Sequence, residues 1–149
     1  MINTRNTDED WKKLGLENPY WGVISDPAFN YLKDENKELL NRFYKTGEDE
    51  VDKLMNTIKN KVKYNFQIGS VLDFGSGVGR LLLPFAQRSS KICYGCDISE
   101  GMHEKCLTRA SHLDLNNIKL IQNLENLQIS FSLVNTRIVL QHIHPKRGI

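Results

Sequence analysis

Hydrophobic positions change their spacing along the chain, which divides it into two parts. In the first part Val51, Leu54 and Ile58 recur every three or four residues, the spacing of one buried helix face. Later in the chain, short apolar runs alternate with amphipathic stretches, the pattern of strands joined by helices. We therefore expect a helical cap region over residues 1–66 and an α/β core over residues 67–149.

Three helices are expected in the cap region. The first begins near Thr7, the second runs from about Pro27 to Tyr44, and the third from about Glu48 to Tyr64. Gly47 separates the second helix from the third, because glycine weakens a helix interior. Residues 18–22 interrupt the chain after the first helix and carry aromatic side chains that are expected to be exposed.

Four parallel strands are expected in the core. The apolar runs place them at residues 71–74, 92–97, 118–121 and within 131–139. Helices are expected at 80–88 and at 100–111, the second of them capped by Ser99. The expected fold is α/β, a doubly wound parallel sheet with helices on its faces. Such sheets usually have further strands, so we expect C-terminal strands to be missing and the exposed sheet edge to favour self-association or a partner chain.

The composition limits the classes of function. The chain has 149 residues, 40% of them hydrophobic and 26% charged, which suits one globular domain with its own core. Its net charge of +2 gives no electrostatic argument for binding nucleic acid. No apolar run approaches the ~20 residues that span a membrane, and the polar N-terminus lacks the features of a signal peptide. We therefore expect a cytoplasmic protein with no membrane partner.

The three cysteines, Cys93, Cys96 and Cys106, are expected to be reduced thiols, because their number is odd and no secretory signal is seen. Cys93 and Cys96 have the spacing of a redox or zinc pair. In a strand, however, this separation places the two side chains on opposite faces. No second pair of ligands stands nearby to complete a zinc site, so no metal is expected.

The segment after the first core strand carries the candidate chemistry. Asp73 ends an apolar run, and Gly75, Gly77 and Gly79 follow at every second position. Glycine permits positive φ and close approach of a ligand, and the helix that follows presents unpaired N–H groups, so the corner suits a nucleotide or nucleoside cofactor. Dinucleotide folds use G-x-G-x-x-G, which would require glycine where this chain has Arg80. A nicotinamide-dependent oxidoreductase is therefore the less favoured alternative.

The spacing Asp73-x-Gly75-x-Gly77-x-Gly79 resembles the first motif of class I S-adenosylmethionine-dependent methyltransferases of the small-molecule type. Two later segments, Tyr94–Met102 and Phe131–Ile143, are similar to the second motif and to the fourth strand of that family, so the resemblance covers roughly residues 70–144. It implies a Rossmann-like fold, S-adenosylmethionine as cofactor, and methyl transfer to a small-molecule acceptor. A truncated or degenerate domain that binds the cofactor or a partner without catalysis is the alternative.

The resemblance also implies a set of cofactor-binding residues. Asp97 would accept the ribose hydroxyls, Ile98 would pack on the adenine, and Asp73 would serve the methionine end directly or through water. Asn123 stands where the family often has an acid that reads the adenine amino group. The complete set is Asp73, Gly75, Ser76, Gly77, Gly79, Asp97, Ile98, Met102, Asn123, Leu124 and Thr136.

His142 is the candidate catalytic base, because a histidine can accept a proton near neutral pH. The alternative is that it caps and packs the segment after the fourth strand. Tyr20, Trp21 and Arg137 are candidates to line an acceptor pocket, with packing as the equal alternative for the aromatic residues. Arg80 is expected to face solvent in preference to pairing with an acid near the site.

Ser132 departs from the resemblance. The family often has an aspartate at this position, in the sequence Phe-Asp-x-Val, and this chain has Phe131-Ser132-Leu133-Val134. That aspartate is commonly structural in the resemblance, so the change is expected to affect stability first.

Overall fold

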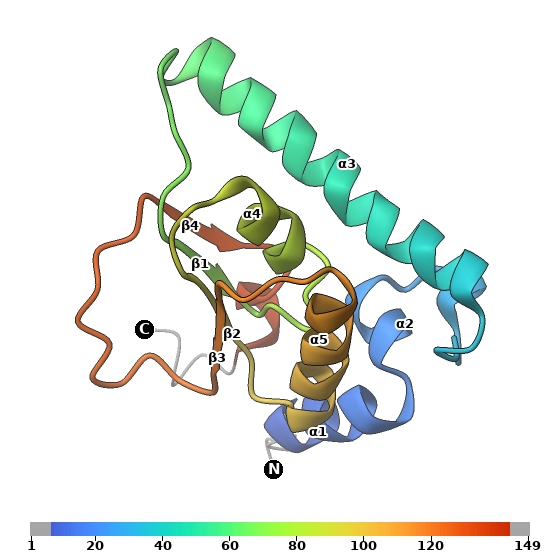
Figure 1. Cartoon of the computed structure of the whole chain (residues 1–149). Helices are drawn as coiled ribbons and strands as arrows, with labels where there is room; N and C mark the ends of the chain where they lie inside the picture. The colour runs from blue at the N-terminus through green and yellow to red at the C-terminus, as the bar shows by residue number, and fades with distance from the viewer. Residues whose placement is uncertain (1–6, 144–149) are drawn as a thin grey trace.

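The four short apolar runs form a parallel sheet in the computed structural model, which describes residues 7–143 (Figure 1). The sheet has the order β3-β2-β1-β4, and its strands are β1 (Val71–Phe74), β2 (Cys93–Cys96), β3 (Ile118–Ile121) and β4 (Leu133–Thr136). All three neighbouring pairs are parallel, and each strand lies within its predicted range. The predicted α/β sheet is therefore confirmed. The outer ends of the two predicted regions, residues 1–6 and 144–149, lie outside the described residues.

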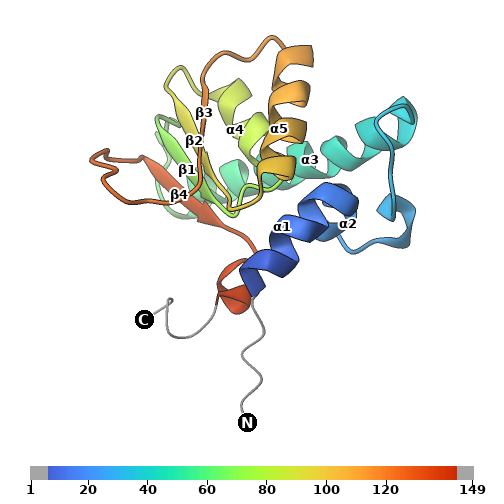
Figure 2. The ribbon, with the colours of Figure 1, turned by 90° about the horizontal axis from the view of Figure 1, so that it is seen from below.

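The two faces of the sheet are covered differently. Helices α4 (Leu82–Arg88) and α5 (Glu100–His112) lie on one face, and the loop between β3 and β4 passes over the other (Figure 2). Ser99 caps α5 as predicted, with its hydroxyl accepting a hydrogen bond from the Met102 amide at 3.4 Å. Phe131, in the loop, packs edge-on against the ring of Tyr94 on the second face.

The cysteines follow the prediction for a strand pair. Cys93 belongs to the main hydrophobic cluster on the helical face, whereas Cys96 belongs to the smaller cluster on the opposite face. Both are buried and unpaired, as is Cys106 on α5. Burial raises the pKa of the Cys96 thiol to about 11 and that of Cys106 to about 12, which keeps both thiols protonated and unreactive at neutral pH. Across residues 7–143 the structure contains no cluster of three or more side chains suited to a metal ion.

Helix α3 (Lys37–Lys61) replaces two predicted helices, so the break predicted at Gly47 is wrong. Gly47 lies inside the helix, and a Cβ added there would lie 2.0 Å from the Arg80 carbonyl oxygen. Glycine at this position therefore lets α3 approach the backbone of the strand-to-helix corner. The close packing offsets the roughly 1 kcal/mol that glycine costs a helix interior.

The predicted start of a helix at Pro27 is also wrong. Pro27–Phe29 is a short 3-10 turn, η1, in which the Ala28 amide donates to the Asp26 carboxylate at 2.8 Å. Tyr31 then adopts a positive φ of 52°, which interrupts the helical path. The long helix begins only at Lys37, after the Asn36 side chain accepts a hydrogen bond from the Leu39 amide.

Helices α1 (Thr7–Glu17) and α2 (Pro19–Val23) form the remaining part of the cap and pack beside α5 (Figure 2). Tyr20 on α2 was predicted to be exposed, but it is only 3% exposed. Its ring packs edge-on against Phe43, and its hydroxyl donates to the Asp34 carboxylate at 2.6 Å. Burial and this carboxylate raise the pKa of the Tyr20 hydroxyl. The hydrophobic core thus runs without interruption from the cap helices to the sheet.

The Ser132 side chain is hydrogen-bonded to the backbone before β1. Its hydroxyl accepts a hydrogen bond from the Gly69 amide at 2.8 Å and donates one to the Ser70 carbonyl at 3.0 Å. These bonds join the residues before β1 to the residue before β4.

Among the helices described, none is long and apolar enough to cross a membrane.

Candidate functional site

The corner after β1 has the conformation that its glycines predict. Gly75, Gly77 and Gly79 have φ values of 78°, 52° and 82°, in the left-handed region that side chains other than glycine rarely adopt. The amides of Gly75 and Ser76 both donate to the Cys96 carbonyl, at 2.7 and 3.1 Å. The corner is therefore tied to the end of the neighbouring strand β2.

Protein side chains pack against the open sides of these glycines. A Cβ added at Gly75 would lie 2.1 Å from Val139 Cγ2, and one added at Gly79 would lie 2.5 Å from Cys106 Sγ. Val139 comes from the segment after β4, and Cys106 from α5. The post-β4 segment and α5 thus pack directly against the backbone of the glycine corner.

Asp97, the first residue after β2, holds the corner from the other side. Its Oδ2 accepts a hydrogen bond from the Gly77 amide at 2.9 Å, and its Oδ1 accepts one from the Ser99 amide at 2.9 Å. A carboxylate offers about four acceptor sites, so each oxygen keeps capacity for one further donor. Asp97 also lines the adjacent cavity.

A cavity of about 930 Å³ lies at the carboxyl edge of the sheet. Because all strands are parallel and in register, the residue that follows each one arrives at this edge. These residues are Gly75, Asp97, Gln122 and Arg137, and all four line the cavity. The strand order reverses between β1 and β4, and ligands of open α/β sheets bind outside the carboxyl ends of strands at such a point.

Asp73 lies behind the corner, outside the cavity lining. It is 3% exposed, and its Oδ1 accepts a hydrogen bond from Asn135 Nδ2 on β4 at 2.7 Å. Burial raises the pKa of the Asp73 carboxyl to about 6, against the opposing effects of the Asn135 hydrogen bond and the Arg80 charge. Asp73 therefore joins β1 to β4 beneath the site.

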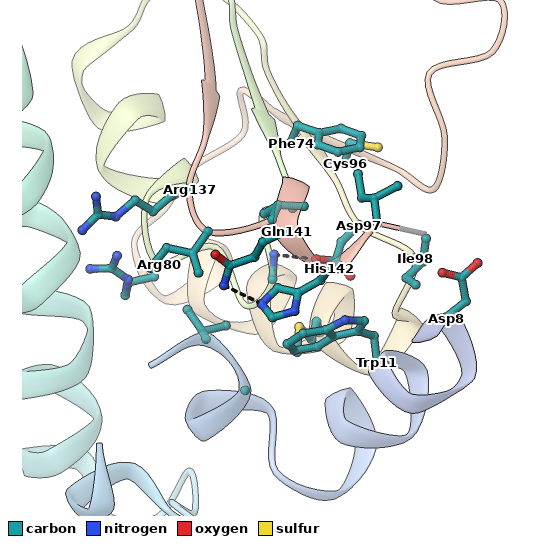
Figure 3. A pocket seen from close by; sticks show the side chains of 18 of the residues that line it. Asp8, Trp11, Phe74, Arg80, Cys96, Asp97, Ile98, Arg137, Gln141 and His142 are labelled. Carbon is teal, nitrogen blue, oxygen red and sulfur yellow. Dashed lines mark hydrogen bonds between the residues drawn. The ribbon is translucent and has the colours of Figure 1, made fainter. Parts of the chain in front are cut away.

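His142 lies at the mouth of the cavity, in the 3-10 turn η2 (Leu140–His142) (Figure 3). Trp11, from α1, contacts its ring edge-on with 4.9 Å between centroids. The amide nitrogen of Gln141 lies 3.1 Å from His142 Nε2. Two neighbours therefore orient the imidazole, which stays exposed. The next histidine in the chain, His144, lies outside the described residues.

The environment of Arg80 contradicts the expected solvent-facing position. Arg80 is 7% exposed, and its Nη2 forms an ion pair with Glu50 Oε2 at 2.7 Å. The other oxygen of Glu50 pairs with Nε of Arg137 at 2.8 Å. The reason is α3, which approaches the corner at Gly47 and presents Glu50 one turn later. The alternative interpretation, that Arg80 pairs with an acid near the site, is confirmed.

A family described as a methyltransferase domain matches residues 71–148, more than half of the chain. The chain belongs to this methyltransferase domain family. The matched region contains the glycine corner, Asp97 and His142, so the resemblance predicted from these residues is confirmed at the level of the family. No curated protein matches the chain significantly.

Solved structures of methyltransferases share the fold of this methyltransferase domain. Phosphoethanolamine N-methyltransferase 1 from Haemonchus contortus, in complex with phosphoethanolamine and S-adenosylhomocysteine, has a TM-score of 0.64 at 17% identity over 93% of this chain. Magnesium protoporphyrin IX methyltransferase from Synechocystis PCC 6803, with bound SAM, has a TM-score of 0.63 at 22% identity over 99% of this chain. This chain spans 26% of the first protein and 69% of the second.

Most of the residues predicted for the site of the methyltransferase domain meet at the cavity. The predicted residues that line it are Gly75, Gly77, Asp97, Ile98, Met102, Asn123, Leu124, Trp21, Arg137 and His142. The predicted residues that do not are Asp73, Ser76, Gly79, Thr136 and Tyr20.

Packing explains four of the five that lie elsewhere. Asp73 and Ser76 are buried under the corner, and Tyr20 is held in the core by Asp34. Gly79 packs against Cys106, as described above. Thr136 is the last residue of β4 and is exposed outside the cavity.

Trp11, Glu50 and Val139 are among the cavity residues that sequence reasoning missed. Trp11 and Glu50 belong to cap helices, where helical spacing shows only that a residue shares a face with others and not which part of the core that face meets. Val139 lies in the segment Phe131–Ile143 that carried the resemblance, and its apolar character was the available signal.

Proposed function

We propose that the cavity binds S-adenosylmethionine and that the methyltransferase domain transfers its methyl group to a small-molecule acceptor. The observation that carries the proposal is the carboxylate of Asp97, which closes the glycine corner and lines the cavity with acceptor capacity to spare. The family match and the fold shared with methyltransferases of known structure support it.

The adenosine end of the cofactor fits the side of the cavity after β2 and β3. Asp97 is placed to accept the two ribose hydroxyls, and Ile98 and Leu124 offer apolar surfaces for the adenine. Asn123 accepts a hydrogen bond from the Glu125 amide at 3.1 Å through its Oδ1, so its amide group is held in a fixed orientation at the cavity wall. The donors and acceptors present therefore suit a nucleoside.

The methionine end fits the glycine corner, where Gly75 and Gly77 line the cavity with backbone alone. S-adenosylmethionine supplies a sulfonium-bound methyl group: the acceptor nucleophile bonds to the methyl carbon in line as the carbon–sulfur bond breaks, and S-adenosylhomocysteine leaves. The role of the chain is to align donor and acceptor. Asp73 contributes by bracing β1 against β4 through Asn135.

The acceptor side is the mouth formed by the cap and η2. Trp21 lines it from α2 and His142 lines it from η2. Trp11 packs against His142 (Figure 3). His142 is placed to take the proton that an O–H or N–H acceptor loses when it is methylated. Methyl transfer from a sulfonium needs little further acid–base help.

Calorimetric titration of the full chain with S-adenosylmethionine, S-adenosylhomocysteine and NAD tests the proposal. We expect both S-adenosyl compounds to bind and NAD not to bind. Asp97→Ala should weaken S-adenosylhomocysteine by about 2–3 kcal/mol, since charge-assisted hydrogen bonds to the ribose are lost. Glu125→Ala, which removes an exposed carboxylate outside the cavity lining, is the matched control and should leave the affinity unchanged.

Two results would contradict the proposal. Binding of NAD alone would favour the oxidoreductase alternative. Binding of none of the three compounds would favour a domain that acts without the cofactor. Asp97→Asn keeps one of the two oxygens and therefore one of the two backbone hydrogen bonds, so it should bind with an affinity between those of the wild type and Asp97→Ala.

A further inference from the structure

Two arginines share one carboxylate at one end of the cavity. Glu50 accepts from Arg80 through Oε2 at 2.7 Å and from Arg137 through Oε1 at 2.8 Å. All three residues line the cavity, and the two arginine side chains extend to the same side of it (Figure 3). They come from three separate elements: α3, the glycine corner and the first position after β4.

The hydrogen-bonding capacity of the two guanidinium groups is incompletely used. Arg80 is buried, its Nη1 donates to Thr46 at 3.3 Å, and its Nε has no hydrogen-bond partner. Arg137 has a side chain 58% exposed and uses only Nε on Glu50, so its two terminal nitrogens have no partner within residues 7–143. The cavity therefore contains a guanidinium whose free edge is open to a ligand.

The charges around the pair favour an anion at Arg137. Glu50 supplies one negative charge to two positive ones. Asp73 is bonded to Asn135 beneath the corner and does not line the cavity. Asp97 and Asp8 do line it, and Asp97 accepts hydrogen bonds from the Gly77 and Ser99 amides, so Glu50 is the carboxylate that pairs with the two arginines. Guanidinium and carboxylate groups pair through two parallel hydrogen bonds, which the two terminal nitrogens of Arg137 are free to make.

We infer that Arg137, backed by Arg80, forms a subsite for a carboxylate of the ligand that fills the cavity. Glu50 holds the two guanidinium groups in place and competes with the ligand for Arg137. The carboxylate has two possible sources, the amino-acid end of the cofactor and the acceptor. The inference rests on the proposed function only for the identity of the first source.

Nuclear magnetic resonance of the arginine Nε–Hε signals tests the subsite directly on the full chain. Benzoate and its uncharged analogue benzamide are titrated into the protein, alone and saturated with S-adenosylhomocysteine. We expect benzoate, but not benzamide, to shift the Arg137 signal saturably in the free protein. The Arg88 signal should not move, since Arg88, at the end of α4, pairs with Asp52 on α3 and does not line the cavity.

Calorimetry then identifies the source of the carboxylate. Arg137→Gln should weaken S-adenosylhomocysteine by at least about fivefold, and leave 5′-methylthioadenosine unchanged, if the cofactor supplies the carboxylate. If the acceptor supplies it, both affinities stay unchanged and benzoate still shifts Arg137 in the S-adenosylhomocysteine complex. Arg88→Gln is the matched control. Glu50→Gln should strengthen benzoate binding, because it removes the competing charge, which a purely structural Glu50 would not do.

The absence of a saturable benzoate shift at Arg137 overturns the inference, and so does an equal response to benzamide. This outcome is independent of the proposed function, since benzoate is titrated into the free protein. Failure of both S-adenosylhomocysteine and 5′-methylthioadenosine to bind would contradict the proposed function alone.

Discussion

Replacing Asp73 by asparagine should abolish part of the dependence of stability on pH. Asp73 is buried, with its carboxyl bonded to Asn135, and burial raises its pKa from 3.8 to about 6. An acid whose pKa is raised on folding stabilises the folded state most below its unfolded pKa. That contribution is lost as the pH rises through the folded pKa.

The size of the effect follows from the two pKa values. A shift from 3.8 to about 6 corresponds to roughly 3 kcal/mol over the full titration, of which about 2 kcal/mol falls between pH 4 and pH 7. Asp73→Asn keeps an oxygen that can accept from Asn135 Nδ2 and has no charge to bury. The wild type should therefore lose stability relative to Asp73→Asn as the pH rises across this range.

Urea unfolding at several pH values between pH 4 and pH 7 measures the difference in the free energy of unfolding between the two proteins. Asp52→Asn reports the effect of removing an exposed carboxylate. For Asp73→Asn, the free energy of unfolding relative to the wild type should rise by roughly 2 kcal/mol between pH 4 and pH 7. For Asp52→Asn it should not change in this way. A flat difference, or one of opposite slope, would refute the account of Asp73 as a carboxyl destabilised by burial.

Three further changes test the packing around the site. Gly47→Ala should destabilise by about 1–3 kcal/mol in urea unfolding, because its Cβ meets the Arg80 carbonyl at 2.0 Å, whereas Asn56→Ala on the exposed side of the same helix should stabilise slightly. Ser132→Ala should cost about 1 kcal/mol, since the hydroxyl makes two backbone hydrogen bonds, and an unchanged midpoint would contradict that role. Ile138→Gly should raise the thermal midpoint, because Ile138 has a φ of 58° and is exposed; a lower midpoint would show that its side chain is needed.

Local sequence patterns predicted the sheet and most of the cofactor side of the cavity. The four strands lie where the apolar runs place them, and α5 begins after Ser99 as its cap predicts. The glycine spacing required a corner with positive φ, and the structure has one. Parallel strands then bring the residues that follow them to one edge, so Asp97 and Gly75 meet there without further information.

The cap and the acceptor side could not be predicted in the same way. Gly47 is a helix breaker by propensity, but contact with Arg80 makes it the residue that lets α3 pack. Tyr20 was expected to be exposed because it lies in the segment that interrupts the chain after the first helix, and its burial depends on Phe43 and Asp34. In both cases a tertiary contact reverses what the local sequence favours.

The sequence by itself therefore determined the strands, the glycine corner and the family, whereas the tertiary structure decided what surrounds them. The ion pair between Arg80 and Glu50 joins residues 30 positions apart, and Val139 reaches Gly75 only because β4 pairs with β1. Strand periodicity and glycine φ depend on neighbours in the chain. Pairing of charges and filling of space depend on which surfaces meet after folding, and that is set by the packing of the whole core.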